Sequence, residues 1–188
     1  MRKEAIFLNF ILGALAGLLI DHLLQSTNIS KNNHTFWFPL CTGLAGAIAA
    51  FSYLALDSRL NYKPKKQDIA SIFRMSGAFI GVNYAVHKLP WTSSSVVSVT
   101  LAILAITVWY LFDGSLHGFI ISFVYAVIGT FAGFILATSG TYTFTQADFF
   151  GVRSWLPCIL YCGCVCFGVI GRALAVDGDL KLKLKKDL

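Results

Sequence analysis

Four cysteines lie within nine residues, in the stretch CILYCGCVCFG, and raise the question of a metal site. On a helix, Cys158, Cys162 and Cys166 follow one another at every fourth position along one stripe, whereas Cys164 lies off that stripe. Zinc is bound tetrahedrally, and one helix cannot place four ligands around it. We therefore expect no metal site. We expect these small side chains to pack against neighbouring helices or, near an interface, to carry an acyl group.

Ionisable side chains are few within the apolar part of the chain, which argues against catalysis. They are Asp21, His22, Arg74, His87 and Arg172, and most lie near the ends of apolar runs, where they can extend to the membrane surface. The sequence shows no pairing of a nucleophile with a base, and neither GxSxG nor HExxH occurs. The sequence predicts a protein that is not an enzyme.

Asp113 separates two long apolar runs in ITVWYLFDGSLHGFIISF. A carboxylate between two membrane helices is expected to stay in contact with water, where its charge costs little. It also precedes a helix N-terminus, which favours negative charge and takes either Asp113 or Ser115 as its cap.

Apolar segments long enough to cross a membrane position these residues. The chain of 188 residues is 56% hydrophobic and 13% charged, with a mean hydropathy of +0.70, unlike a soluble domain. A membrane helix needs roughly 20 mostly apolar residues. Such segments are predicted at about residues 5–24, 36–56, 69–87, 95–112, 116–138 and 155–175. We predict an all-α integral membrane protein, in which residues 1–188 form a single compact bundle of six transmembrane helices and 176–188 a cytosolic basic tail.

Small residues four positions apart predict close approach of helix backbones. The pairs are Gly13 with Gly17, Gly43 with Ala47, and Gly77 with Gly81. The spacing leaves open whether each pair packs inside the protein or against a partner.

The distribution of Lys and Arg predicts that both termini are cytosolic. With six spans, most of these residues fall on the side of the termini, mainly in the 59–66 loop and the 181–186 tail, and few on the other side. Asn28 and Asn33 each begin a glycosylation tripeptide in the first loop of that other side. Orientation and contact with anionic lipid explain the net charge of +6, so we expect no nucleic-acid partner.

The sequence ends in KKDL, with Lys185 and Lys186 at the positions of a dilysine retrieval signal. Such a signal is read on a cytosolic tail and is typical of endoplasmic reticulum membrane proteins. A chance pair in a basic tail is the alternative. We predict residence in the endoplasmic reticulum membrane as a multi-pass protein.

Four stretches together resemble the Insig (insulin-induced gene) family, six-span regulators of sterol synthesis. They are FIGVNYAVHK, VWYLFDGSLHGF, DFFGVRSWLPCILYCG and GVIGRALA. The resemblance extends from Phe36 to Ala175 without gaps.

The resemblance implies an adaptor without catalytic activity or cofactor. With an oxysterol such as 25-hydroxycholesterol bound, Insig proteins hold Scap and its cargo SREBP in the endoplasmic reticulum. They also present HMG-CoA reductase to ubiquitin ligases for degradation, which gives feedback control of cholesterol synthesis. The physical basis is linkage, because a sterol that binds adaptor and partner together more tightly raises their mutual affinity.

The resemblance also implies roles for particular residues. Asp113 matches the aspartate that the family needs for partner binding. Phe79, Val96, Thr100 and Trp109 match positions of the sterol site, although Val96 stands where the family has a glutamine. Each has a packing alternative, such as a Thr100 hydroxyl bonded back into its own helix.

A small transporter or lipid-handling membrane protein is the alternative function. Its candidate residue is Arg74, which lies about one turn inside the third apolar segment, although it can also extend to the membrane surface. Asn83 is expected to be a buried amide that ties helices together.

Overall fold

The computed structural model describes residues 3–25, 29–30, 37–64, 69–88, 94–139, 143–144 and 152–186, which form six long helices and one short strand pair. The helices are α1 (Lys3–Gln25), α2 (Trp37–Leu60), α3 (Ile69–Lys88), α4 (Ser94–Phe112), α5 (Leu116–Thr138) and α6 (Leu156–Lys186). The strands β1 (Ile29–Ser30) and β2 (Thr143–Phe144) pair antiparallel, with Ile29 opposite Phe144.

The predicted all-α bundle of six helices is confirmed, and most helix ends lie within one or two residues of the predicted ones. Two helices run further: α2 continues from the expected residue 56 to Leu60, and α6 continues through the expected tail to Lys186. Among the described residues, four segments are long and apolar enough to cross a membrane, namely Lys3–Ile20, Pro39–Leu60, Leu116–Thr138 and Leu156–Val176. The apolar part of α4, Val96–Phe112, is somewhat shorter.

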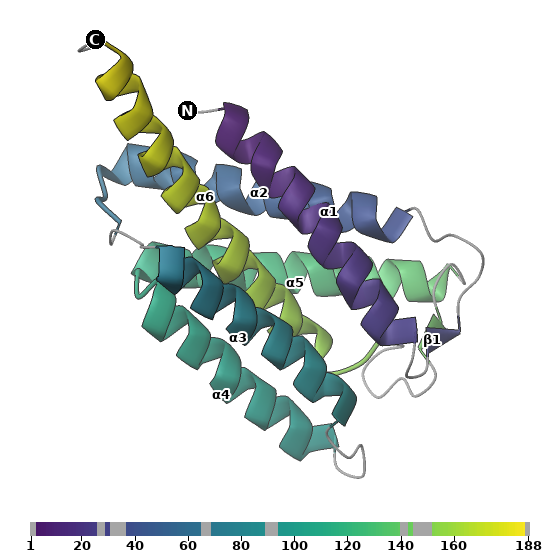
Figure 1. The fold of residues 1–188 in the computed structure, drawn as a ribbon. Coiled ribbons are helices and arrows are strands. Elements are labelled where there is room, and N and C mark those ends of the chain that lie inside the picture. Colours follow the sequence, from purple (N-terminus) through teal and green to yellow (C-terminus); the bar gives the residue numbers. More distant parts are fainter. Residues whose placement is uncertain are drawn as a thin grey trace.

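Helix α6 is the central element of the bundle. It contacts each of the other five helices and crosses the middle of the molecule in Figure 1. More of it is buried than of the other membrane-length helices. The main core joins it to α3 and α4, through residues that include Met75, Phe79, Leu101, Ala105, Val165 and Val169.

Glycines permit two of the close helix contacts. A Cβ atom on Gly13 would lie 2.6 Å from the backbone oxygen of Thr42, so α1 and α2 meet at the backbone, as predicted. On α6, a Cβ atom at Gly168 would lie 2.6 Å from the ring of Tyr53 in α2. In contrast, nothing described lies within 4 Å of a Cβ built on Gly77 or Gly81, so the predicted close approach at this pair does not occur within the described chain.

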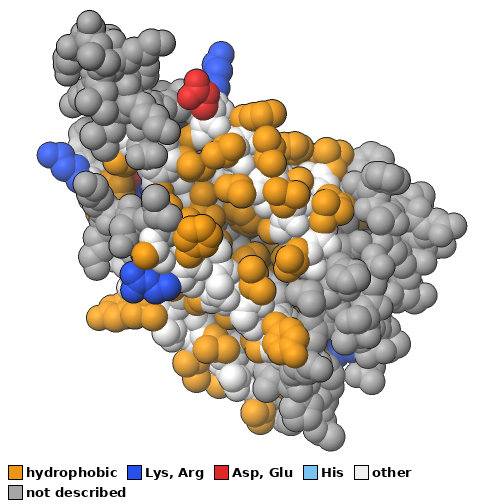
Figure 2. All heavy atoms as spheres, in the orientation of Figure 1, with side chains coloured by type: hydrophobic (Ala, Val, Ile, Leu, Met, Phe, Trp, Pro, Cys, Tyr) orange, Lys and Arg blue, Asp and Glu red, His pale blue; other side chains and the backbone are white. Residues whose placement is uncertain are grey.

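The outer surface is apolar, as a membrane bundle requires. Figure 2 shows hydrophobic side chains across the middle of one face, with Lys and Arg mainly towards its upper and left margins. Helix α5 is the most outward-facing of the membrane-length helices, and it exposes large side chains such as Phe123, Ile128 and Phe131. These side chains face the space that lipid occupies.

A tight turn joins α4 to α5. The backbone N–H groups of Asp113 and Gly114 both donate to the carbonyl of Trp109, at 2.9 and 2.8 Å, and Gly114 has a φ of 62°, which favours glycine. Ser115 then caps α5, since its hydroxyl accepts the N–H of Gly118 at 3.2 Å. Of the two predicted caps, Ser115 is the one used.

Candidate functional site

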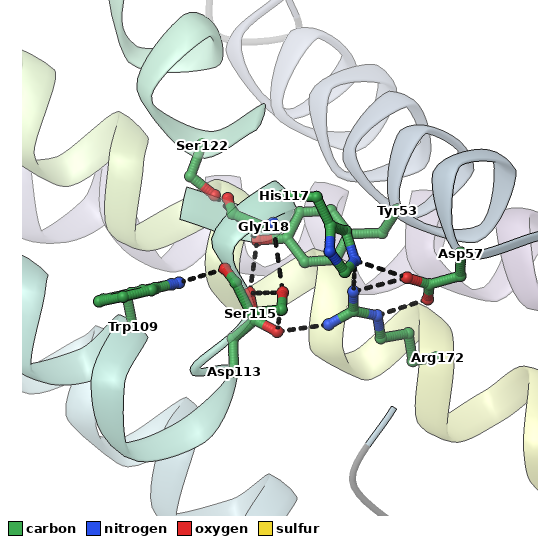
Figure 3. A network of polar contacts seen from close by, with 9 residues as sticks. All are labelled: Tyr53, Asp57, Trp109, Asp113, Ser115, His117, Gly118, Ser122 and Arg172. Carbon is green, nitrogen blue, oxygen red and sulfur yellow. Dashed lines mark hydrogen bonds and ion pairs between the residues drawn. The ribbon is translucent and has the colours of Figure 1, made fainter. Parts of the chain in front are cut away.

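Polar side chains from four parts of the chain meet near the end of α2, around Arg172 of α6 (Figure 3). The Nε and Nη2 atoms of Arg172 donate to the two carboxylate oxygens of Asp57, at 2.6 and 2.7 Å. Its Nη1 atom donates to Oδ1 of Asp113. The planar guanidinium thereby joins α2 and the α4–α5 turn to α6. We call Tyr53, Asp57, Asp113, Ser115, His117 and Arg172 the charge cluster.

The side chain of Asp113 is enclosed, with 0% of its surface exposed. The hydroxyl of Ser115 lies 2.7 and 2.9 Å from its two oxygens and donates to one of them at a time. The expectation that this carboxylate stays in contact with water is therefore wrong. Arg172, one of the ionisable residues near the ends of apolar runs, is also buried, with its side chain only 4% exposed. Each charge is buried because the other neutralises it.

Tyr53 and His117 complete the cluster. The ring of Tyr53 lies 4.5 Å from the guanidinium carbon of Arg172, and its hydroxyl lies 2.9 Å from the hydroxyl of Ser122. Nε2 of His117 lies 2.8 Å from Oδ1 of Asp57 and 2.7 Å from Nη2 of Arg172. This nitrogen donates to the carboxylate in one tautomer and accepts from the guanidinium in the other. His117 is thus the cluster member whose bonding depends on its proton.

The charges of the cluster hold helices together and are directed at one another. Two buried carboxylates face one guanidinium, so the cluster carries one excess negative charge when His117 is neutral. Removing one partner of a buried ion pair leaves an uncompensated charge, which typically costs about 3–5 kcal/mol. The first turn of α5 has no room for a side chain here, because a Cβ atom on Gly118 would overlap Oδ2 of Asp113.

A second candidate site is a partly open cavity of about 180 Å³ lined by residues of α1, α2, α3, α5 and α6. Its wall is almost entirely apolar and includes Phe79 from α3, Phe167 from α6, and Trp155 just before α6 begins. Asn83 also lines it; its side-chain nitrogen donates to the carbonyl of Phe79 at 2.8 Å. Pockets for drug-sized ligands hold roughly 300–1,000 Å³. The cavity therefore accepts part of a lipid-sized molecule without movement of the helices.

The structure does not bring the four predicted sterol residues together. Phe79 is buried on the cavity wall, with its ring 6.1 Å from that of Phe167. Val96 is 63% exposed on the outside of α4, and the exposed Thr100 donates its hydroxyl to the carbonyl of Val96 at 2.8 Å. Trp109 is half-buried, and its indole N–H donates to the carbonyl of Ser115 at 2.9 Å.

Comparison with known proteins identifies the family. The family model described as "Insulin-induced protein (INSIG)" matches residues 4–175. The chain belongs to the Insig family. It is 35% identical over 183 residues to the insulin-induced gene 1 protein of Danio rerio, covering 92% of this chain and 73% of that one. The insulin-induced gene 2 protein of Gallus gallus is 33% identical over 177 residues, covering 89% and 79%.

The Insig fold is also found in a solved structure. The crystal structure of MvINS, a mycobacterial Insig homolog from Mycobacterium vanbaalenii, superimposes with a TM-score of 0.77 over 93% of this chain and 96% of that one. The sequence identity is 23%, so this likeness concerns the fold. The resemblance inferred from the sequence is thus confirmed at the level of both family and architecture.

Other predicted residues of this Insig chain are placed as follows. Cys162, Cys164 and Cys166 are buried between helices, and the described residues hold no group of three or more His, Cys, Asp or Glu side chains arranged for a metal ion. Asn28 and Asn33 lie outside the described residues. Lys185 and Lys186 are the last two residues of α6, and their side chains are not among those that the structure describes.

Arg74, the candidate for transport, is exposed on α3, and its Nε atom donates to the carbonyl of Ala70 in its own helix at 3.2 Å. It does not line the cavity. Its position agrees with an arginine that extends to the membrane surface, and it gives the transport alternative no support.

Sequence reasoning missed Asp57, Tyr53 and His117 as members of the cluster. Asp57 fell just beyond the predicted end of the second span, and the longer α2 brings it inside. A signal was present: an arginine within an apolar helix needs a counter-charge at its own depth. Asp57 and Asp113 are acids at segment ends on the same side of the predicted topology, so both qualified as partners.

Proposed function

We propose that this Insig protein is an oxysterol-dependent adaptor of the endoplasmic reticulum membrane. With a sterol of the 25-hydroxycholesterol type bound, it retains Scap with SREBP and presents HMG-CoA reductase to ubiquitin ligases. The observation that carries the proposal is membership of the Insig family over residues 4–175. The relatives named above are insulin-induced gene proteins, and neither carries the name of an enzyme.

The apolar surfaces of the bundle support a sterol as the ligand. A sterol is a rigid apolar body with a few hydroxyl groups, and both the cavity and the outer face of α4 offer apolar walls with isolated polar groups. The polar side chains include Asn83 in the cavity and Thr100 on α4. Linkage favours the outer face, because a ligand there touches adaptor and partner at once.

The proposal includes an orientation in the membrane and a retrieval signal for the endoplasmic reticulum. The end of the bundle that holds the charge cluster faces the cytosol, which agrees with exposed Arg59 and Lys63 beside it and with the positive-inside bias. Helix α6 then ends in the cytosol, where Lys185 and Lys186 are available as a retrieval signal. Membrane lipid surrounds the apolar exterior.

The test is co-purification of Scap, and separately of the reductase, with and without 25-hydroxycholesterol. We expect sterol to increase capture of either partner, by at least fivefold if the coupling is in the usual range. Equal capture with and without sterol would contradict the proposal.

Two substitutions that add bulk distinguish the two possible sterol sites, the outer face of α4 and the cavity. Thr100→Trp adds bulk to the outer face of α4, whereas Gly163→Leu adds bulk to the cavity wall. We expect Thr100→Trp to abolish the sterol response and Gly163→Leu to retain it. Ile128→Trp is the matched control, since Ile128 is 64% exposed on α5, away from α4. The opposite pattern would place the sterol in the cavity.

A further inference from the structure

The carboxylate of Asp113 is already fully used inside the protein. Oδ1 accepts from Nη1 of Arg172 and from the hydroxyl of Ser115, which also lies 2.9 Å from Oδ2. The hydroxyl of Tyr53 approaches Oδ2 to 3.4 Å. With 0% of the side chain exposed, a partner cannot meet this carboxylate unless the cluster opens.

Arg172 connects the α4–α5 turn, through Asp113, to α2 and α6. From the central helix α6 it donates two hydrogen bonds to Asp57, near the end of α2, and one to Asp113 in the turn. Its guanidinium rests on the ring of Tyr53, which belongs to α2 and is itself 0% exposed. The turn is therefore bonded to side chains that lie buried inside the bundle.

The α4–α5 turn presents apolar surface next to the buried acid. Tyr110, Leu111 and Leu116 are 69%, 62% and 73% exposed, and they flank Asp113 on both sides. Trp109 is fixed to the same turn by its indole N–H on the carbonyl of Ser115. These exposed side chains are therefore carried by the same turn that the charge cluster holds through Asp113.

We propose that Asp113 acts in partner binding as a positioning residue, which works through Arg172 and Tyr53 to hold the α4–α5 turn in place. This inference rests on the proposed adaptor function. It differs from a direct contact between the Asp113 carboxylate and the partner, and it assigns Tyr53, Asp57 and Arg172 to partner binding from within the bundle.

The first test uses a buried hydroxyl that no partner reaches. Tyr53→Phe keeps the ring under Arg172 and removes the hydroxyl from Asp113, Gly118 and Ser122. We expect the affinity for Scap in the presence of 25-hydroxycholesterol to fall by about two- to tenfold, as for the loss of one hydrogen bond. Tyr161→Phe is the matched control, because the buried hydroxyl of Tyr161 has no hydrogen-bond partner within the described chain. Unchanged affinity in Tyr53→Phe, or equal loss in both variants, would overturn the inference.

The second test needs no partner. Amide hydrogen exchange over residues 113–118 reports whether the turn is held, because the N–H groups of Asp113, Gly114 and Gly118 are bonded there. We expect Arg172→Gln to speed exchange as much as Asp113→Asn does, and Arg59→Gln, which removes an exposed charge from α2, to leave it unchanged. Wild-type exchange in Arg172→Gln would overturn the inference. If the wild-type chain fails to capture Scap, the proposed function is wrong, and this measurement still decides whether Asp113 acts through Arg172.

Discussion

Arg172 and Asp57 are 115 positions apart and are joined by two hydrogen bonds, Nε to Oδ2 at 2.6 Å and Nη2 to Oδ1 at 2.7 Å. The side chains are 4% and 8% exposed, so water cannot replace either partner. This paired geometry ties the central helix α6 to α2, and the same guanidinium extends the tie to Asp113.

Loss of Arg172 alone is expected to be severe. Arg172→Met leaves Asp57 and Asp113 buried without a counter-charge, so we expect a loss of about 3–5 kcal/mol in the free energy of unfolding. Thermal unfolding of the purified protein in detergent, followed by intrinsic fluorescence, measures this. Arg59→Met is the control, because Arg59 is exposed and its loss is expected to cost no more than about 0.5 kcal/mol. Similar midpoints for both variants would show that the ion pair is not structural.

Removal of both charges of the pair is expected to be milder than removal of one. In Arg172→Met combined with Asp57→Leu, only Asp113 is left without its counter-charge, so we expect a higher unfolding midpoint than for Arg172→Met alone. The same detergent measurement compares the two. A double variant less stable than the single one would mean that packing, and not charge, dominates this end of the bundle.

Gly118→Ala and Gly77→Ala compare the effect of an added methyl group at a crowded glycine with its effect at a glycine that has open space beside it. The added methyl at Gly118 meets Oδ2 of Asp113 and the hydroxyl of Ser115, which also loses its role as cap, so we expect destabilisation of about 1–3 kcal/mol. At Gly77 nothing described lies within 4 Å, and alanine is the better helix former by about 1 kcal/mol. Unfolding midpoints should therefore move in opposite directions.

Phe79→Ala tests the cavity wall. Phe79 is buried against Phe167, and its truncation enlarges the cavity, so we expect a loss of about 3–5 kcal/mol. Phe73→Ala on the same helix is the control, because Phe73 is 73% exposed and its loss removes little packing. A stability loss in Phe79→Ala that added sterol does not recover would indicate a packing role, whereas recovery by sterol would place the ligand in the cavity.

The proposed retrieval signal is tested by location in cells. We expect Lys185→Ser with Lys186→Ser to release the protein to later secretory compartments, seen by microscopy against organelle markers. Lys181→Ser with Lys183→Ser removes the same charge from the same helix and should leave the protein in the endoplasmic reticulum. Release of both variants would show that tail charge alone is responsible, whereas retention of both would contradict the proposed signal.

Helix positions could be predicted from sequence because they depend on local quantities. A run of about 20 apolar residues defines a membrane helix whatever surrounds it, and the predicted segments lie close to the observed helices. Gly13 shows the same for packing, since its spacing predicted a close backbone approach and the structure shows that α2 makes it. Gly77 has the same spacing but meets no described neighbour, because spacing does not say which way a helix face turns.

The charge cluster could not be predicted because it depends on how helices are rotated and how deep their ends lie. Asp113 was expected in water, yet Arg172 of α6, Tyr53 of α2 and Ser115 all contact it, and its side chain is 0% exposed. The sterol residues came from family resemblance alone. Sequence carries no information on whether Phe79 and Thr100 face one cavity, and the structure places them on different surfaces.

The central place of α6 has a consequence for biosynthesis. The helix that contacts all five others follows them in the chain, so α1 to α5 enter the membrane before the residues that pack them together exist. Until Arg172 is translated, Asp57 and Asp113 have no guanidinium to bind. A chain that ends before α6 therefore has both acids but not the arginine that neutralises them, so we expect this end of the bundle to become stable only when synthesis is complete.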